Sequence, residues 1–229
     1  MRDYSQEQRE PFTLKILNSF GPNPRMVRMF MAEKGIELEM VEHDLMGAEN
    51  RTPAYVSKNP GGQLPAMELD DGTVLAETVV MCEFLEDHHP APALVGTNAL
   101  ERAEARMWNR RIEQKITENM YNGFRFAEGL ELFRERMRCM PEAADGLKAI
   151  AQDGLKWFDE QISGKQFICG DRLTIGDLVL YCCTDFAKGV GQPLDANLKN
   201  FSEWFARIEA RPSASASLHP AAEEVGMRG

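Results

Sequence analysis

The chain has 229 residues, of which 43% are hydrophobic and 27% are charged, an ordinary mixture for a globular protein with a buried core. Its formal net charge of −10 argues against nucleic acid as a partner, because phosphate binding needs a basic face and none stands out. The five cysteines show no Cys-x-x-Cys spacing, the first residues hold no apolar signal core, and no apolar run reaches the roughly 18 residues of a membrane span. We therefore expect a reducing, cytoplasmic location and no membrane partner.

The first part of the chain alternates short strands with helices, after an expected flexible tail at 1–11. In order, the pattern predicts a strand at 14–18, a helix at 22–34, a strand at 36–43, a short helix or irregular loop at 49–57, strands at 64–69 and 73–76, and a helix at 77–88. Because a tight Asp71-Gly72 turn makes the last two strands antiparallel, this β-α-β-α-β-β-α order predicts a mixed four-stranded sheet. The expected fold of residues 12–89 is the α/β, thioredoxin-like layout.

The pattern becomes all-helical after a proline-rich linker at 90–98. Apolar stripes predict helices at 98–127, 141–162, 174–188 and 198–210. Arg211-Pro212 ends the last helix, so a helical-bundle domain is expected over 99–212. The Ser/Ala-rich residues 213–229 are expected to form a loosely held C-terminal tail.

The segment from Asn59 to Thr78 is the most informative one. Pro65 lies in a predicted strand although it has no N–H to give a neighbouring strand. It is either an ordinary edge-strand proline or part of a cis Leu64–Pro65 bond that exposes the backbone polar groups of Leu64 to a ligand. Glu77 and Thr78 open the next helix, where they either hold a ligand at the helix N-terminus or only cap the helix.

Four pieces of the sequence resemble cytosolic glutathione transferases of the bacterial type. They are SFGPNPRMVRMFMAEKG at 19–35, ENRTPAYVSKNPGGQLP at 49–65, LAET at 75–78 and GDRLTIGDLVL at 170–180. The first piece is similar both to members with a Ser/Thr-Pro-Asn motif after the first strand and to bacterial aryl-ether-cleaving members. The resemblance covers residues 13–212. It implies a homodimer that uses glutathione as co-substrate beside a site for a small hydrophobic electrophile.

The chemistry of glutathione asks for three contacts in the N-terminal domain. Leu64, next to Pro65, would exchange backbone hydrogen bonds with the cysteinyl unit. Glu77 and Thr78 would take the ammonium and carboxylate of the γ-glutamyl end. The candidates for the glycine carboxylate are Gln63, Arg51, Asn50 and Lys58, each of which also fits a solvated surface role. No metal is expected, because no spacing of His, Cys, Asp or Glu indicates a metal site.

A thiolate-stabilising donor is expected between the first strand and the first helix. The usual Ser, Thr or Cys of the family is replaced by Gly21, and Pro24 follows Asn23. The amide of Asn23 is therefore the first catalytic candidate, with helix capping as its alternative role, and Ser19 is the second. The missing hydroxyl leaves open a non-catalytic glutathione-binding module.

The electrophile pocket is expected near the long helix. Its candidates are Tyr121, Trp108 and Phe20, although Trp108 also lies on the apolar stripe, where packing explains it equally well. The resemblance leaves three reactions open, namely conjugation, aryl-ether cleavage and disulfide or peroxide reduction. Thr174 and Asp177 predict a structural capping box rather than a catalytic pair.

Overall fold

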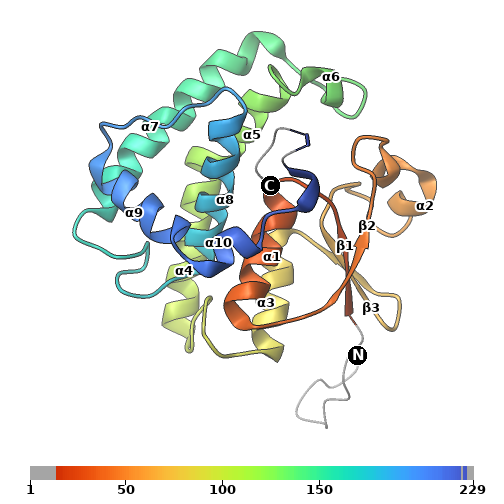
Figure 1. The fold of residues 1–229 in the computed structure, drawn as a ribbon, viewed down its shortest axis with the longest axis horizontal. Coiled ribbons are helices and arrows are strands. Elements are labelled where there is room, and N and C mark those ends of the chain that lie inside the picture. The colour runs from red at the N-terminus through yellow and green to blue at the C-terminus, as the bar shows by residue number, and fades with distance from the viewer. Residues whose placement is uncertain (1–13, 223, 226–229) are drawn as a thin grey trace.

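The computed structural model describes residues 14–222 and 224–225. The sheet of the N-terminal part lies on one side of helix α1 (Pro22–Lys34), and the helical C-terminal part lies on the other side (Figure 1). This arrangement confirms the predicted thioredoxin-like sheet domain followed by a helical bundle.

The N-terminal part contains β1 (Leu14–Asn18), α1 (Pro22–Lys34), β2 (Glu39–Glu42), η1 (Glu49–Arg51), α2 (Pro53–Val56), β3 (Ala66–Leu69), β4 (Val74–Ala76) and α3 (Thr78–His88). The helical part contains α4 (Ala99–Ile112), the π-helical segment η2 (Glu113–Thr117), α5 (Glu118–Arg125), α6 (Leu130–Phe133), η3 (Pro141–Ala143), α7 (Ala144–Ile162), α8 (Ile175–Gly189), α9 (Lys199–Glu209), α10 (Pro212–Ala216) and η4 (Pro220–Ala222).

The described strands form a mixed sheet in the order β2-β1-β3-β4. β1 runs parallel to β2, whereas the β1–β3 and β3–β4 pairs are antiparallel. Ile16 and Met67 face the large core shared with α1 and α3, while Leu17 and Ala66 face a smaller cluster with Tyr55 of α2. The sheet is therefore covered on both faces, and its strand ends meet α1 and α3 at one edge.

The predicted strand at 64–69 is shorter than expected and begins at Ala66. Pro65 therefore precedes the ladder, which removes the conflict with its missing N–H. The Leu64–Pro65 peptide bond is cis. The strand predicted at 36–43 is likewise shorter and covers only Glu39–Glu42.

The helix predicted at 98–127 contains the π-helical segment η2, which was not predicted. Its stripe advances in steps of four residues through Ile112, Ile116, Met120 and Phe124, and all four side chains are buried. In a regular α-helix each such step drifts by about 40° around the axis, so the stripe would rotate away from the core. The wider turn of η2 absorbs part of this drift and keeps the stripe on one side.

Residues 212–217 correct the expectation of a loosely held tail for the first part of 213–229, whereas 223 and 226–229 lie outside the described residues. Pro212–Ala216 form α10, which lies against α1, and Ser217 is fully buried (Figure 1). The guanidinium of Arg25 in α1 donates to the carbonyl of Ala214 at 3.1 Å and to Oγ of Ser217 at 3.3 Å. The sequence pattern missed this docking because the partner is a single buried arginine far away in the chain.

Arg25 also forms a fully buried ion pair with Asp185 of α8, with 2.6 Å between Nη1 and Oδ2. Asp185 has a second cation at 3.3 Å, the ammonium of Lys188. The hydroxyl of Tyr181 lies 3.4 Å from Nη2 of Arg25. One side chain thus joins α1 to α8 and α10.

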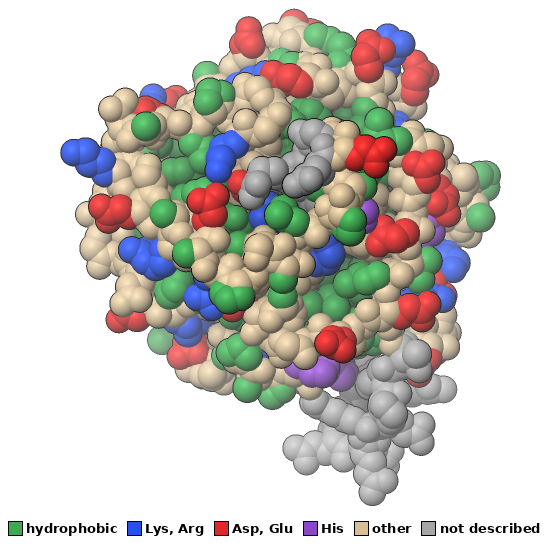
Figure 2. Space-filling view, in the orientation of Figure 1, with side chains coloured by type: hydrophobic (Ala, Val, Ile, Leu, Met, Phe, Trp, Pro, Cys, Tyr) green, Lys and Arg blue, Asp and Glu red, His purple; other side chains and the backbone are tan. Residues whose placement is uncertain are grey.

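The surface seen in Figure 2 intersperses acidic and basic side chains rather than separating them. Several form exposed or half-exposed pairs, such as Arg102 with Asp87 and Arg106 with Glu83. Among the helices in the described ranges, none is long and apolar enough to cross a membrane.

The Arg25–Asp185 pair yields a stability prediction. Arg25→Met leaves the Asp185 carboxylate buried without its main partner, so the free energy of unfolding in urea should fall by about 3–5 kcal/mol. The double variant Arg25→Met/Asp185→Leu should recover part of that loss, because no uncompensated charge remains. Arg134→Gln, which removes an exposed pair with Glu131, is the matched control and should cost less than about 1 kcal/mol. An Arg25→Met loss no larger than the control's would contradict the role given to this pair.

Candidate functional site

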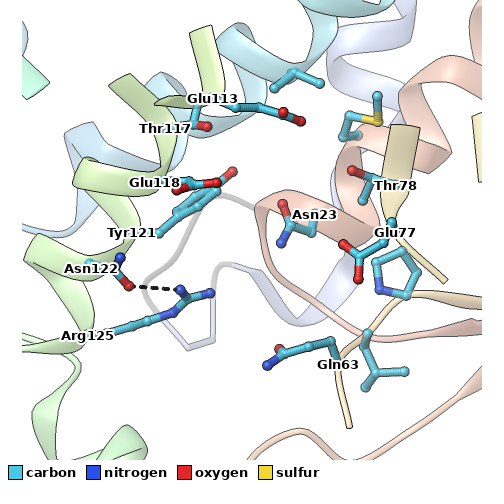
Figure 3. A pocket seen from close by; sticks show the side chains of 14 residues that line it. Asn23, Gln63, Glu77, Thr78, Glu113, Thr117, Glu118, Tyr121, Asn122 and Arg125 are labelled. Atoms are coloured by element: carbon cyan, nitrogen blue, oxygen red, sulfur yellow. Dashed lines mark hydrogen bonds between the residues drawn. The ribbon is translucent and has the colours of Figure 1, made fainter. Parts of the chain in front are cut away.

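A cavity of about 330 Å³ lies where the N-terminal ends of α1 and α3 and the start of β3 face the helical part (Figure 3). The N-terminal part lines it with Asn23, Met26, Gln63, Leu64, Pro65, Glu77 and Thr78. The helical part lines it with Glu113, Thr117, Glu118, Tyr121, Asn122, Arg125 and Val179. A smaller cavity of about 90 Å³ adjoins it and shares Asn23, Gln63, Leu64, Tyr121 and Arg125. Residues of both parts are therefore needed to form the site.

Glu77 and Thr78 lie at the start of α3 and line the cavity (Figure 3). Glu77 is the N-cap residue, but its side chain makes no capping hydrogen bond. Its backbone has φ 69° and ψ 118°, a left-handed conformation that is costly for a residue with a Cβ. The free N–H groups of the first turn and the positive end of the helix dipole are available to an anion there.

The loop before Pro65 is fixed by the side chains of Tyr55 and Asn59, which sequence reasoning did not single out, and by that of Asn50, which was a ligand candidate. The hydroxyl of Tyr55 and the amide of Asn59 both donate to the carbonyl of Gln63, at 2.7 and 2.9 Å. The amide of Asn50 donates to the carbonyl of Gly62 at 2.7 Å. These bonds hold the chain as it enters the cis Leu64–Pro65 bond at the cavity wall.

Asn23 lies in the first turn of α1, and its side chain faces the cavity (Figure 3). The N-cap of α1 is Gly21, which has φ 120°, a conformation that only glycine adopts easily. Pro22 occupies the first helical position, so the missing proline N–H costs α1 no hydrogen bond. The side chain of Asn23 makes neither a capping bond nor a hydrogen bond to another residue in the described part of the chain. Asn23 therefore does not act as a helix cap in this structure.

Three of the other candidates lie outside the two cavities. Ser19 is buried and donates its hydroxyl to the carbonyl of His43 at 2.9 Å. Lys58 pairs with Glu68 at 2.8 Å on the outer side of the sheet. Trp108 packs against Trp157 in the helical core with a ring-centroid distance of 5.9 Å, which agrees with the packing alternative.

The remaining candidates line the smaller cavity. Phe20, Asn50 and Arg51 all contribute to its wall. Asn50 already uses its amide on the loop, whereas Nε of Arg51 is buried without a hydrogen-bond partner. Tyr121 lines both cavities, and burial raises the pKa of its hydroxyl well above the usual value.

Sequence reasoning missed the polar residues that the helical part contributes. Glu118, Asn122 and Arg125 follow one another at spacings of four and three, so they share a face of α5 with Tyr121. Figure 3 shows these side chains facing Asn23 and Gln63 across the cavity, with Arg125 bonded to Asn122 at 3.1 Å. The sequence did contain a signal for these residues, because they form a polar stripe on α5 beside its apolar stripe.

Comparison with known proteins agrees with this architecture. Residues 20–88 match the family model for the glutathione S-transferase N-terminal domain, and residues 141–207 match that for the glutathione S-transferase C-terminal domain. Glutathione S-transferase 2 of Saccharomyces cerevisiae is 27% identical over 205 residues, which cover 86% of each chain.

Solved structures of this family also resemble the chain. A glutathione S-transferase domain-containing protein of Marinobacter aquaeolei VT8 is 33% identical, with a TM-score of 0.83 over 87% of this chain and 99% of that one. The β-etherase LigF of Sphingobium sp. strain SYK-6 shares the fold, with a TM-score of 0.75 at 23% identity over 90% of this chain and 98% of that one. The chain therefore belongs to the glutathione S-transferase family and is an enzyme of that family.

Proposed function

We propose that this enzyme binds glutathione in the larger cavity and stabilises its thiolate for attack on a small electrophile. One observation supports this more than any other. The backbone of Leu64 and the first turns of both α1 and α3 meet at the same cavity. A peptide with charged ends and a central thiol can meet a matching group at each of these places.

Each part of glutathione would have its own partner. The cysteinyl unit lies along the backbone of Leu64 like a short added strand. The γ-glutamyl carboxylate takes free N–H groups at the start of α3, and its ammonium takes the carboxylate of Glu77. The glycine carboxylate lies toward Gln63 and Arg51. The positive φ of Glu77 fits this role, since such conformations concentrate where a ligand needs a side chain held in place.

Asn23 would donate its amide N–H to the thiolate. A free alkyl thiol has a pKa near 8.5, and lowering it by about two units needs roughly 2.7 kcal/mol of selective stabilisation. A hydrogen bond to a charged group supplies about 1.5–3 kcal/mol, and the N-terminus of α1 adds its dipole. Stabilisation of the thiolate by Asn23 and the N-terminus of α1 therefore needs no Ser or Thr hydroxyl.

The thiolate must come from glutathione rather than from a buried cysteine of the protein. Burial raises the pKa of Cys182 to about 11 and that of Cys183 to about 12. Both thiols are therefore protonated near neutral pH and shielded from substrate.

In the proposed reaction the thiolate sulfur forms a bond to a carbon or sulfur atom of the co-substrate. The bond from that atom to its leaving group breaks, and the leaving group departs with the electron pair. The thiol proton passes to solvent. Conjugation, aryl-ether cleavage and the first step of disulfide reduction all follow this course. In peroxide reduction the sulfur instead bonds to a peroxide oxygen as the O–O bond breaks, and in both reductions a second glutathione thiolate then forms glutathione disulfide and releases the remaining leaving group. A screen of aryl halides, aryl ethers, disulfides and peroxides with glutathione would distinguish among these reactions.

We also propose a homodimer in a reducing cytoplasm. Exposed apolar side chains on the neighbouring helices α3 and α4, namely Val80, Leu100 and Met107, support a second copy as partner. All five cysteines are free, as expected for a reducing compartment.

Asn23→Ala tests the proposed thiolate contact. The variant should lose tenfold or more in kcat/KM, because one charge-assisted hydrogen bond is worth about 1.5–3 kcal/mol. The pKa of the bound glutathione thiol should rise by roughly one to two units, so the pH–rate profile should move toward alkaline pH. Asn197→Ala, at an exposed turn, is the matched control. An unchanged pH profile in Asn23→Ala would show that Asn23 does not contact the thiolate.

Glu77 gives a paired test of ligand binding and backbone strain. Glu77→Ala and Glu77→Gly both remove the carboxylate, so calorimetry should show about tenfold weaker glutathione binding for each. Only the glycine variant relieves the positive φ, so only it should gain stability, by about 1 kcal/mol in urea unfolding. If Glu77→Ala bound glutathione with wild-type affinity, Glu77 would not contact glutathione.

A further inference from the structure

Three arginines from separate segments converge on the smaller cavity. Arg51 comes from η1, Arg125 from the end of α5, and Arg136 from the segment after α6. The apolar part of the same wall is largely aromatic and includes Phe124, Phe133 and Phe186. The cavity wall therefore combines aromatic rings with three guanidinium groups.

These three guanidinium groups are not neutralised within the described residues. None of them forms an ion pair there, although the chain carries a net charge of −10 and other arginines, such as Arg106 and Arg211, are paired. Seven of the fourteen arginines in the described ranges form an ion pair, so an unpaired arginine by itself decides little. Three unpaired arginines that line one cavity favour an anion supplied from outside.

Each arginine also keeps hydrogen-bond donors unused. The hydrogen bonds found go to oxygens of the protein: Arg125 to Oδ1 of Asn122 at 3.1 Å, Arg136 to the carbonyl of Met46 at 3.1 Å, and Arg51 to the carbonyl of Gly61 at 3.4 Å. A guanidinium has five N–H groups, so most remain available.

Arg125 is held in place by its neighbours. Its guanidinium carbon lies 5.7 Å from the ring centre of Tyr121 and 5.5 Å from that of Phe133. Figure 3 shows the guanidinium between Asn122 and the side chain of Gln63, facing the cavity. Burial lowers the pKa of Arg125, and the charge of Arg51 lowers it further. Burial and then the charge of Arg51 also lower the pKa of Arg136, while the carboxylate of Asp44 partly offsets them. An incoming anion would relieve this repulsion.

We propose that the co-substrate is an aryl compound bearing a carboxylate, and that Arg125 and Arg136 bind that carboxylate. The inference rests on the proposed function, because it names the substrate class of the same site. Phe124, Phe133 and Phe186 pack on the aryl ring. Arg51, which contacts the loop at Gly61, is left for the glycine carboxylate of glutathione.

Binding of two glutathione conjugates tests this without any need for turnover. The probes are S-(4-carboxybenzyl)glutathione and its benzoate methyl ester, measured by calorimetry on the full-length protein. The wild type should bind the carboxylate about tenfold or more tightly than the ester, as expected for a charge-assisted contact. Arg125→Gln and Arg136→Gln should each reduce that ratio severalfold while ester affinity changes less than about twofold. Arg134→Gln, on the same segment and paired with Glu131 at the surface, should leave the ratio unchanged.

The alternative outcomes separate the two proposals. Equal wild-type affinity for both conjugates would overturn the carboxylate site while leaving glutathione binding intact. Failure of both conjugates, and of glutathione itself, to bind would overturn the proposed function and the inference with it. If Arg125→Gln and Arg136→Gln weaken glutathione and both conjugates by the same factor, these arginines serve glutathione and the inference is wrong.

Discussion

Burial of α1 on two sides is the constraint on which the rest of the structure depends. Met26, Val27, Met29 and Phe30 are almost completely buried, so this helix has little solvent face and must pack against both the sheet and α8. Arg25 lies among them and needs a buried partner, because an unpaired charge there would be too costly. Its bonds to α8 and α10 fix α1 against the helical part. The first turn of α1, with Asn23, is thereby fixed at the cavity.

Two buried carboxylates fix the connections around this helix. Glu86 of α3 accepts hydrogen bonds from the N–H groups of Leu94 and Val95 and pairs with Lys34 at 2.6 Å, so the linker is tied to both helices. Asp177 forms the predicted capping box with Thr174 and also accepts from other groups of the helical core. Each carboxylate is satisfied by several donors, the condition under which buried polar groups rigidify a structure rather than weaken it. The linker and the helical core are thus held by polar contacts as well as by apolar packing.

What could be predicted from the sequence follows from how local each determinant is. The hairpin at Asp71-Gly72, the boundaries of α1 and the helix start at Thr78 depend on neighbouring residues, and these were predicted well. Ser19 faces away from the cavity because its hydroxyl is used by a strand that pairs with β1 only in the folded chain. Arg125 was missed because its importance depends on a cavity whose other side lies between 102 and 47 residues earlier in the chain, from Asn23 to Thr78. A pattern along one helix shows which residues share a face, but not what that face meets.

The charges around the two cavities are separated in a way that gives a ligand one preferred direction. Glu77, Glu113 and Glu118 line the larger cavity, whereas Arg51 and Arg136 line only the smaller one. Arg125 belongs to both and marks the boundary between them. An ammonium is therefore favoured near the start of α3 and a carboxylate near the aromatic wall, and reversing the ligand would place like charges together. Charge complementarity of this kind can orient a ligand before any bond changes.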